Sequence, residues 1–139
     1  MDRRSIIEEL EKYYADQNEA VFVYLFGSHA KGINRENSDI DIAVYLDAAL
    51  DKTHEYKIEE TICLQNLLKK RVDLIILNHA PPILANQVFR YGVPVKGSKS
   101  RQLSDFRVAN FYKYLDQVNL TNKIFNINKN RIMESVKNG

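Results

Sequence analysis

Two aspartates two positions apart are the residues of this sequence with the clearest chemical potential. Asp39 and Asp41 flank Ile40 in an otherwise apolar run, the pattern of a β-strand in which alternate side chains share one face. Their Cβ atoms would lie roughly 6.6 Å apart, so the carboxylates could converge on two divalent cations about 3.5–4 Å from each other. Without a cation the like charges would repel, and the pattern therefore favours Mg²⁺ or a similarly hard ion.

A third acidic residue and a glycine–serine pair could complete this site. Asp73 is the second residue of the apolar run Val72–Leu77. If that run is a neighbouring strand, about 4.8 Å away, its carboxylate reaches the same ions and can help to take a proton from an attacking hydroxyl. Gly27 ends another apolar run and permits a sharp turn, after which backbone amides and the Ser28 hydroxyl can bind phosphate oxygens. Lys31, one turn further on, could neutralise phosphate charge.

The order GS-x₁₀-DxD, which spans residues 27–41, resembles the signature of the DNA polymerase β-like nucleotidyltransferase superfamily. The stretches 26–32 (FGSHAKG) and 38–44 (SDIDIAV) are similar to the GSxARG and SDIDLAV motifs of its minimal nucleotidyltransferase (MNT) members, which are antitoxins of HEPN ribonuclease toxins. The similarity continues through 71–75 (RVDLI) and covers roughly residues 5–95. Lys31 stands where these proteins usually have arginine, a difference that matters because arginine binds phosphate through a planar fork.

This resemblance implies an activity, its cofactors and a partner. Antitoxins of this kind transfer AMP from ATP, with Mg²⁺, to a tyrosine hydroxyl of the HEPN toxin and so neutralise it. Applied to this chain, the resemblance and the spacing together assign catalysis and two Mg²⁺ ions to three carboxylates, and nucleotide binding to the first turn: Asp39, Asp41 and Asp73, and Gly27, Ser28 and Lys31.

The elements that position these residues follow from the periodicity of the apolar residues. Helical spacing predicts helices over about residues 2–14, 53–70 and 81–91, and again from Ser104. Runs rich in β-branched and aromatic residues predict strands over 20–26, 39–46 and 72–77, with a short extended edge at 93–95. The expected fold is α/β, a small mixed β-sheet flanked by helices. The dozen residues between the first two strands leave open whether these strands are parallel or antiparallel.

Charge divides the chain into two parts. Residues 1–95 hold 11 Lys and Arg against 15 Asp and Glu, whereas residues 96–139 hold 9 against 3. We therefore expect a minimal nucleotidyltransferase domain over 1–95 and a basic helical extension over 96–139 that docks on the domain or on a partner. Ser104 would cap its first helix, and beyond Leu120 the helix would be broken or dependent on a partner. Four apolar residues would face the body: Phe106, Phe111, Leu115 and Val118.

Composition excludes several protein classes. With 45% hydrophobic and 27% charged residues among 139, the chain is expected to fold as a globular protein. Its apolar runs are too short to cross a bilayer and its first residues do not form a secretory signal, so a cytoplasmic protein without membrane contact is expected. The single cysteine excludes an intrachain disulfide and a multi-cysteine zinc site. Direct binding of nucleic acid is not expected, although aromatic and lysine residues of the extension resemble a base-stacking surface.

The three histidines and the single cysteine are not assigned to a metal or catalytic site. His29, His54 and His79 have no metal-ligand spacing, and His29 is interpreted as a surface residue. Cys63 lies on the apolar stripe of the helix over 53–70, together with Ile58 and Ile62, and is interpreted as a small core residue.

Two other functions remain open at this stage. The first is a nucleotidyltransferase that modifies a small molecule such as an aminoglycoside, although 139 residues leave little room for a dedicated substrate domain. The second is a non-catalytic antitoxin that masks its partner simply by binding it. An RNA-tailing role is disfavoured because such enzymes carry further RNA-binding domains.

Overall fold

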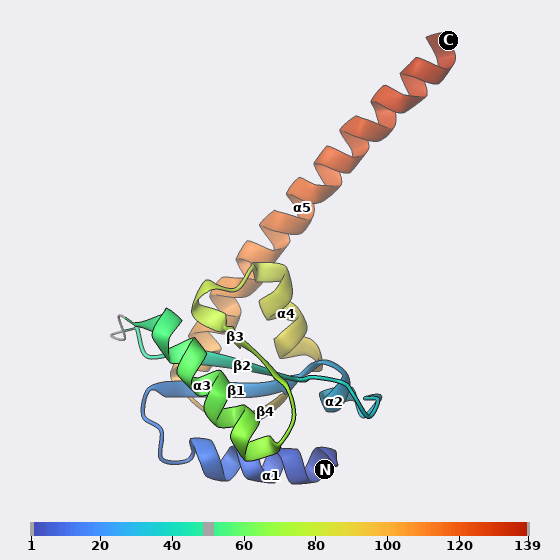
Figure 1. Ribbon diagram of the computed structural model, residues 1–139. Coiled ribbons are helices and arrows are strands. Elements are labelled where there is room, and N and C mark those ends of the chain that lie inside the picture. The colour runs from blue at the N-terminus through green and yellow to red at the C-terminus, as the bar shows by residue number, and fades with distance from the viewer. Residues whose placement is uncertain (1, 49–51, 139) are drawn as a thin grey trace.

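The computed structural model describes residues 2–48 and 52–138, which alternate between helices and strands (Figure 1). Asp2 caps the first helix as predicted, because its Oδ1 accepts a hydrogen bond of 2.8 Å from the Ser5 backbone N–H. In chain order the elements are α1 (Arg3–Tyr14), β1 (Ala20–Phe26), α2 (Gly27–Lys31), β2 (Ile40–Leu46), α3 (Thr53–Leu68), β3 (Val72–Ile76), the 3₁₀ turn η1 (Leu77–His79), α4 (Pro82–Tyr91), β4 (Val93–Lys96) and α5 (Arg101–Asn138).

The four strands form one mixed sheet in the order β3-β2-β1-β4. β1 is antiparallel to both β2 and β4, whereas β2 and β3 are parallel. The question left open by the sequence is thus settled in favour of an antiparallel β1–β2 pair. The five residues of α2 are too few to carry the chain back along β1, so β2 begins at the edge where β1 ends.

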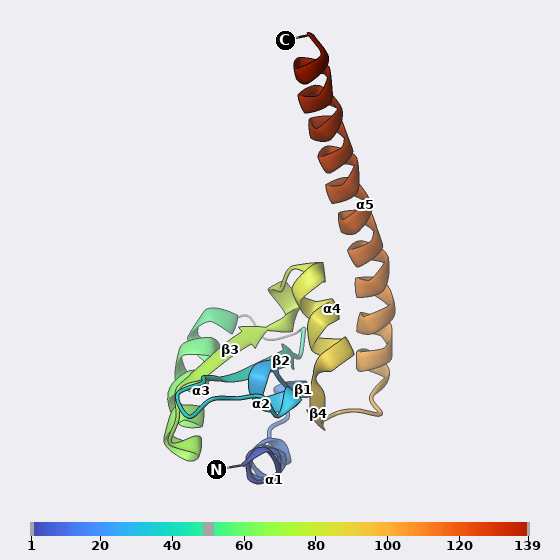
Figure 2. The ribbon, with the colours of Figure 1, turned by 90° about the vertical axis from the view of Figure 1, so that its right-hand side faces the viewer.

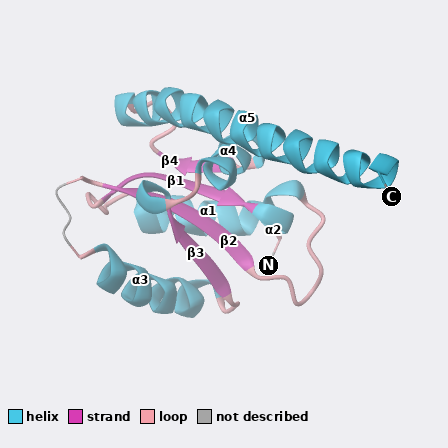
Figure 3. Cartoon of the chain, turned by 90° about the horizontal axis from the view of Figure 1, so that it is seen from above, coloured by secondary structure: helices cyan, strands magenta, loops and turns pink. Residues whose placement is uncertain are grey.

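The two faces of the sheet are covered by different helix pairs (Figures 2 and 3). α1 and α3 cover one face with mainly aliphatic side chains, among them Leu10 and Leu64, which pack on Ile42 and its neighbours. α4 and α5 cover the other face with an aromatic cluster, in which Phe22 stacks on Tyr45 at a centroid distance of 4.6 Å. Because side chains alternate along a strand, residues 41, 43 and 45 of β2 belong to this second face.

The buried side of α3 differs from the prediction. Glu60, Leu64 and Leu68 are the buried residues of this helix. Ile58 and Ile62 are 51% and 54% exposed, and Cys63 is exposed as well, so the prediction of a core cysteine was wrong. The apolar residues of α3 lie around much of its circumference, and periodicity alone therefore chose the wrong side.

α5 also departs from the prediction in its start and its continuity. It begins at Arg101, and Ser100 Oγ accepts the Leu103 N–H at 3.2 Å, so Ser100 caps the helix in place of Ser104. The helix continues without interruption to Asn138, whereas a break was expected after Leu120. At about 1.5 Å per residue its 38 residues form a rod that extends well beyond the body (Figure 1).

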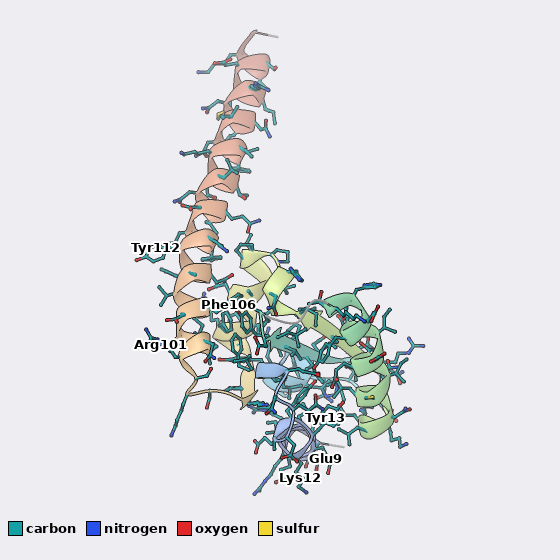
Figure 4. All side chains as sticks on the ribbon, turned by 90° about the vertical axis from the view of Figure 1, so that its left-hand side faces the viewer. Glu9, Lys12, Tyr13, Arg101, Phe106 and Tyr112 are labelled. Carbon is teal, nitrogen blue, oxygen red and sulfur yellow. The ribbon has the colours of Figure 1, made fainter. Side chains whose placement is uncertain are left out.

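The first turns of α5 attach it to the body. Leu103 and Asn110 are buried, and Phe106 packs into the aromatic cluster, where its ring lies 4.9 Å from that of Tyr45. Phe111 and Leu115, predicted to face the body, are instead 50% and 39% exposed. Figure 4 shows Phe106 directed toward the sheet and Tyr112 directed away from it. Of the helices in the described part of the chain, α5 included, none combines the length and apolar character needed to cross a membrane.

Candidate active site

The parallel pairing of β2 and β3 brings two of the predicted carboxylates side by side. Asp41 and Asp73 are direct partners in the register of these strands. Neighbouring strands lie about 4.8 Å apart, and equivalent positions in a pair project to the same side of the sheet. Both residues therefore lie on the face covered by α4 and α5, at the end of it where Asp73 remains exposed and Asp41 is half-buried.

Asp39 completes the acidic group from the residue before β2. It lies two positions before Asp41, so it approaches the same face, and its side chain is exposed. An open pocket of about 810 Å³ adjoins it, and it is lined by Glu36, Asn37, Ser38, Asp39, Lys69, Lys70 and Arg71. A second hollow, of about 770 Å³, is lined by residues of α4 and α5.

Gly27 brings the turn after β1 directly against Asp41. It has φ +72°, a left-handed conformation that favours glycine, and a Cβ added there would collide with Asp41 Oδ2. The pairing of Phe26 with Asp41 across β1 and β2 explains this close approach. Ser28, the next residue, is half-buried in α2. The turn that the sequence predicts to bind phosphate thus lies in contact with Asp41.

His29 has a structural role that the sequence interpretation missed. Its side chain is 1% exposed, so the expectation of a surface histidine was wrong. The Nε2–H donates a hydrogen bond of 3.1 Å to the Ser38 carbonyl oxygen, which ties α2 to the residue before Asp39. No local sequence pattern reveals this bond, because its acceptor is a backbone group nine residues away.

The electrostatics of the site mark Asp41 as the central carboxylate. The pKa of Asp41 is raised from 3.8 to about 6, most strongly by burial and then by the nearby charges of Asp73 and Asp39, while His29 acts to lower it. The three carboxylates therefore repel one another across the edge of the sheet. A cation placed among them would remove this repulsion.

The donor set fits a hard divalent cation, although the side chains are not yet gathered around one. Among residues 2–48 and 52–138, no three acidic, histidine or cysteine side chains stand close enough together to hold a metal ion as they are. The backbone positions of Asp41 and Asp73 are nevertheless side by side, and aspartate side chains can change rotamer when a ligand binds. Carboxylate oxygens are the ligands that Mg²⁺ and similar ions prefer.

Lys31, the last residue of α2, has a partner of its own. Its Nζ lies 4.9 Å from the centroid of the Tyr91 ring, and its side chain is exposed. Of the six predicted site residues, Gly27 contacts Asp41 and Ser28 follows it in α2, while Lys31 lies one helical turn further along.

The comparisons with known proteins agree with this geometry. The chain matches the family described as "Polymerase beta, Nucleotidyltransferase" over residues 8–102. It is 33% identical over 94 residues to the protein adenylyltransferase MntA of Shewanella oneidensis, and the aligned part makes up 67% of this chain and 66% of that protein.

Solved structures extend the similarity to almost the whole chain. A chain in the crystal structure of a toxin–antitoxin with AMP-PNP matches with a TM-score of 0.71 and 28% identity, covering 91% of this chain and 97% of that one. A chain in the structure of the tri-AMPylated Shewanella oneidensis HEPN toxin with MNT antitoxin matches with a TM-score of 0.69 and 26% identity, covering 89% and 96%. The family match spans most of the chain, and the chain belongs to the polymerase beta nucleotidyltransferase family, whose members act on a nucleotide and typically use a divalent metal ion.

Proposed function

We propose that this chain is an antitoxin-type protein adenylyltransferase, which transfers AMP from ATP to a tyrosine hydroxyl of a cognate HEPN ribonuclease toxin and so neutralises it. Two observations support the proposal: the relative in Shewanella oneidensis is a protein adenylyltransferase, and a matching structure contains a tri-AMPylated HEPN toxin with its MNT antitoxin. We place the reaction in the cytoplasm, where ATP and Mg²⁺ are abundant.

One observation carries the chemical part of the proposal. Asp41 is the register partner of Asp73 on one side, and the Gly27 backbone presses against its carboxylate on the other. Metal-binding oxygens and a phosphate-binding turn therefore share one small volume, as in-line displacement at an α-phosphate requires.

Each site residue then has a distinct task. Asp39 and Asp41 would hold two Mg²⁺ ions and Asp73 would complete the coordination of one of them, while the ions when bound lower the pKa of the acceptor hydroxyl and neutralise charge on the phosphates. Asp73 would accept the proton of the tyrosine hydroxyl. The tyrosine oxygen forms a bond to the α-phosphorus, and the bond from that phosphorus to pyrophosphate breaks. Ser28 and Lys31 would bind the phosphates that leave.

Transfer to a purified toxin tests the activity directly. We expect incubation with ATP, Mg²⁺ and the candidate toxin to add mass to the toxin in steps of one adenylate, and we expect the double variant Asp39→Ala, Asp41→Ala to add none. Asp16→Ala, at an exposed position between α1 and β1, is the matched control and should retain transfer. Transfer by the double variant would refute the metal-site assignment.

The same experiment separates the alternatives. A wild-type protein that silences the toxin without adding mass would act as a non-catalytic masking antitoxin. Labelled AMP on an aminoglycoside, with none on the toxin, would instead identify a small-molecule enzyme.

We further propose that the outer half of α5 is the partner-docking part of the basic extension over residues 96–139. Residues 119–137 are all exposed, and apolar side chains recur among them, including Ile124 and Phe125. Asn126 and Asn130 lie one turn apart on a polar strip of the same helix, the side that we expect to face solvent when the partner is bound.

A substitution test fits this helix better than removal of the whole extension. Deleting residues after Lys96 would expose the aromatic cluster that Phe106 covers, and the nucleotidyltransferase domain itself would lose stability. We expect Ile124→Asp with Phe125→Asp to weaken toxin binding at least about tenfold while leaving ATP binding unchanged. Asn126→Asp with Asn130→Asp adds the same charge on the polar strip and should bind normally. Equal losses in both pairs would show that charge, and not apolar contact, is responsible.

A further inference from the structure

Tyr91, a residue outside the recognised motifs, lies against Lys31 of α2, the helix that begins at Gly27. β4 pairs with β1 so that Val93 opposes Leu25, two residues before Gly27, and α4, which ends at Tyr91, contacts α2. Gly92 permits this approach, because a Cβ there would stand 3.1 Å from the Leu25 carbonyl oxygen and collide with that of Val88. Tyr91, the last residue of α4, is thereby fixed at the end of β1.

The ring of Tyr91 gathers positive charge at this point. Lys31 Nζ lies 4.9 Å from the ring centroid, and the Arg90 guanidinium carbon lies 5.3 Å from the same centroid. Both distances are within the range of a cation–π interaction, in which the negative face of an aromatic ring attracts a cation. Two cations from different helices, α2 and α4, are thus assembled on one ring.

This arrangement gives the Gly27–Ser28 turn two unlike sides. On the β2 side, Phe26 pairs with Asp41, so the carboxylates flank the turn there. On the β4 side, α4 contacts α2, and Lys31 and Arg90 share the Tyr91 ring there. A triphosphate bound at the turn would meet metal-binding oxygens at one end and fixed positive charge at the other.

We propose that Tyr91 is a positioning residue that holds Lys31 and Arg90 beside the turn, so that these cations bind the β- and γ-phosphates of the nucleotide. Lys31 is exposed, and a free lysine loses rotamer entropy when it binds phosphate. The Tyr91 ring reduces that loss by holding the side chain in place beforehand. The inference rests on the proposed nucleotide site, but it does not depend on which acceptor receives the AMP.

Calorimetric titration of the full-length chain with inorganic tripolyphosphate and with ATP–Mg²⁺ tests the inference. We expect Tyr91→Leu to weaken binding of both probes by about 3- to 5-fold, the loss of an exposed cation–π contact. Tyr91→Phe retains the ring and should bind like the wild type. Tyr112→Leu, which changes a 65% exposed tyrosine of α5, is the matched control and should bind normally.

A double-mutant cycle distinguishes positioning from mere structural support. If Tyr91 acts through Lys31 and Arg90, Tyr91→Leu should cause little further loss in a background that carries both Lys31→Ala and Arg90→Ala. An equal loss in that background, or a loss for ATP–Mg²⁺ without one for tripolyphosphate, would overturn the inference, the latter because the ring would then contact the base.

Thermal unfolding of each variant provides a check on folding. Should Tyr91→Leu fail to fold, the comparison of Tyr91→Phe with Tyr91→Trp still decides, since tryptophan is the strongest cation–π partner and should bind tripolyphosphate at least as tightly. Weaker binding by Tyr91→Trp than by Tyr91→Phe would overturn the inference. A protein that binds ATP normally yet adds nothing to the toxin would contradict the proposed function and leave this inference standing.

Discussion

Burial raises the pKa of two carboxyl groups, Asp41 and Glu60. They lie on opposite faces of the sheet and have different neighbours. Around Asp41 the nearest ionisable groups are other carboxylates, at an open edge. Around Glu60 they are the hydroxyls of Tyr13, Tyr14 and Tyr56, between α1 and α3. Figure 4 shows Tyr13 on α1, far from the aromatic cluster beneath α5.

The difference shows what distinguishes a reactive carboxylate from a structural one. The tyrosines interact with Glu60 and lower its pKa, partly offsetting the effect of burial, although Tyr14 Oη, Tyr56 Oη and Glu60 Oε1 form no hydrogen bond of normal geometry. Glu60 in turn raises the pKa of Tyr14 and Tyr56, for which burial is the larger cause. Neighbours that interact favourably with the charged form lower the pKa of a buried carboxyl group, whereas like charges raise it and leave the group in need of a cation.

Activity should separate the two carboxylates most strongly. We expect Asp41→Asn to lower the rate of AMP transfer by about 10³-fold or more, because loss of a metal-binding oxygen removes several kcal/mol of transition-state stabilisation. Glu60→Gln should leave the rate within about twofold. A single-turnover assay with saturating ATP measures both, and a comparable loss in Glu60→Gln would erase the distinction.

Stability should separate them in the opposite direction. We expect Glu60→Ala to lower the free energy of unfolding by about 2 kcal/mol, because it removes a buried side chain between α1 and α3 and leaves a cavity there. Glu60→Gln keeps the volume of the side chain and should cost less. Urea denaturation measures these changes, and an unchanged midpoint for Glu60→Ala would show that the cluster contributes nothing to folding.

The smallest effect concerns the pH dependence of stability. Folding raises the pKa of Asp41 to about 6 from 3.8, so its favourable contribution is complete below about pH 4 and is lost as the pH rises through 6. We therefore expect Asp41→Asn to raise the free energy of unfolding by about 1 kcal/mol at pH 7.5, a value reduced for solvent screening of this half-buried group.

Denaturation of both proteins at pH 4 is the control for that effect, since the advantage of Asp41→Asn should disappear there. Added Mg²⁺ at pH 7.5 should reverse it, because a cation that binds only the folded wild type stabilises it. If Asp41→Asn is still more stable than the wild type at pH 4, the gain does not come from removing the charge of Asp41.

Much of this architecture could be predicted from the sequence, because local patterns encode it. The strand at Ile40–Leu46 and the cap at Asp2 follow from alternation and from side-chain chemistry that act within a few residues. The antiparallel course of β1 and β2 could not be predicted, since it depends on how far the short α2 carries the chain.

Other features depended on contacts that no local pattern records. Ile58 and Cys63 suit a core as well as Leu64 does, and only the packing of α3 on the sheet decides among them. Burial of His29 follows from its bond to the Ser38 carbonyl group. Tyr91 was overlooked because its contact with Lys31 arises from the packing of α4 on α2, which lie far apart in the sequence.

The parallel pairing of β2 with β3 has a consequence for how this enzyme can be controlled. Asp41 belongs to an interior strand, hydrogen-bonded on both sides, so withdrawing it from the site would require dismantling the sheet. We expect the catalytic groups to remain assembled at all times, with turnover switched by the arrival of nucleotide and acceptor. We expect the activity of such an enzyme to follow the concentrations of nucleotide and acceptor, without a prior conformational activation of the sheet.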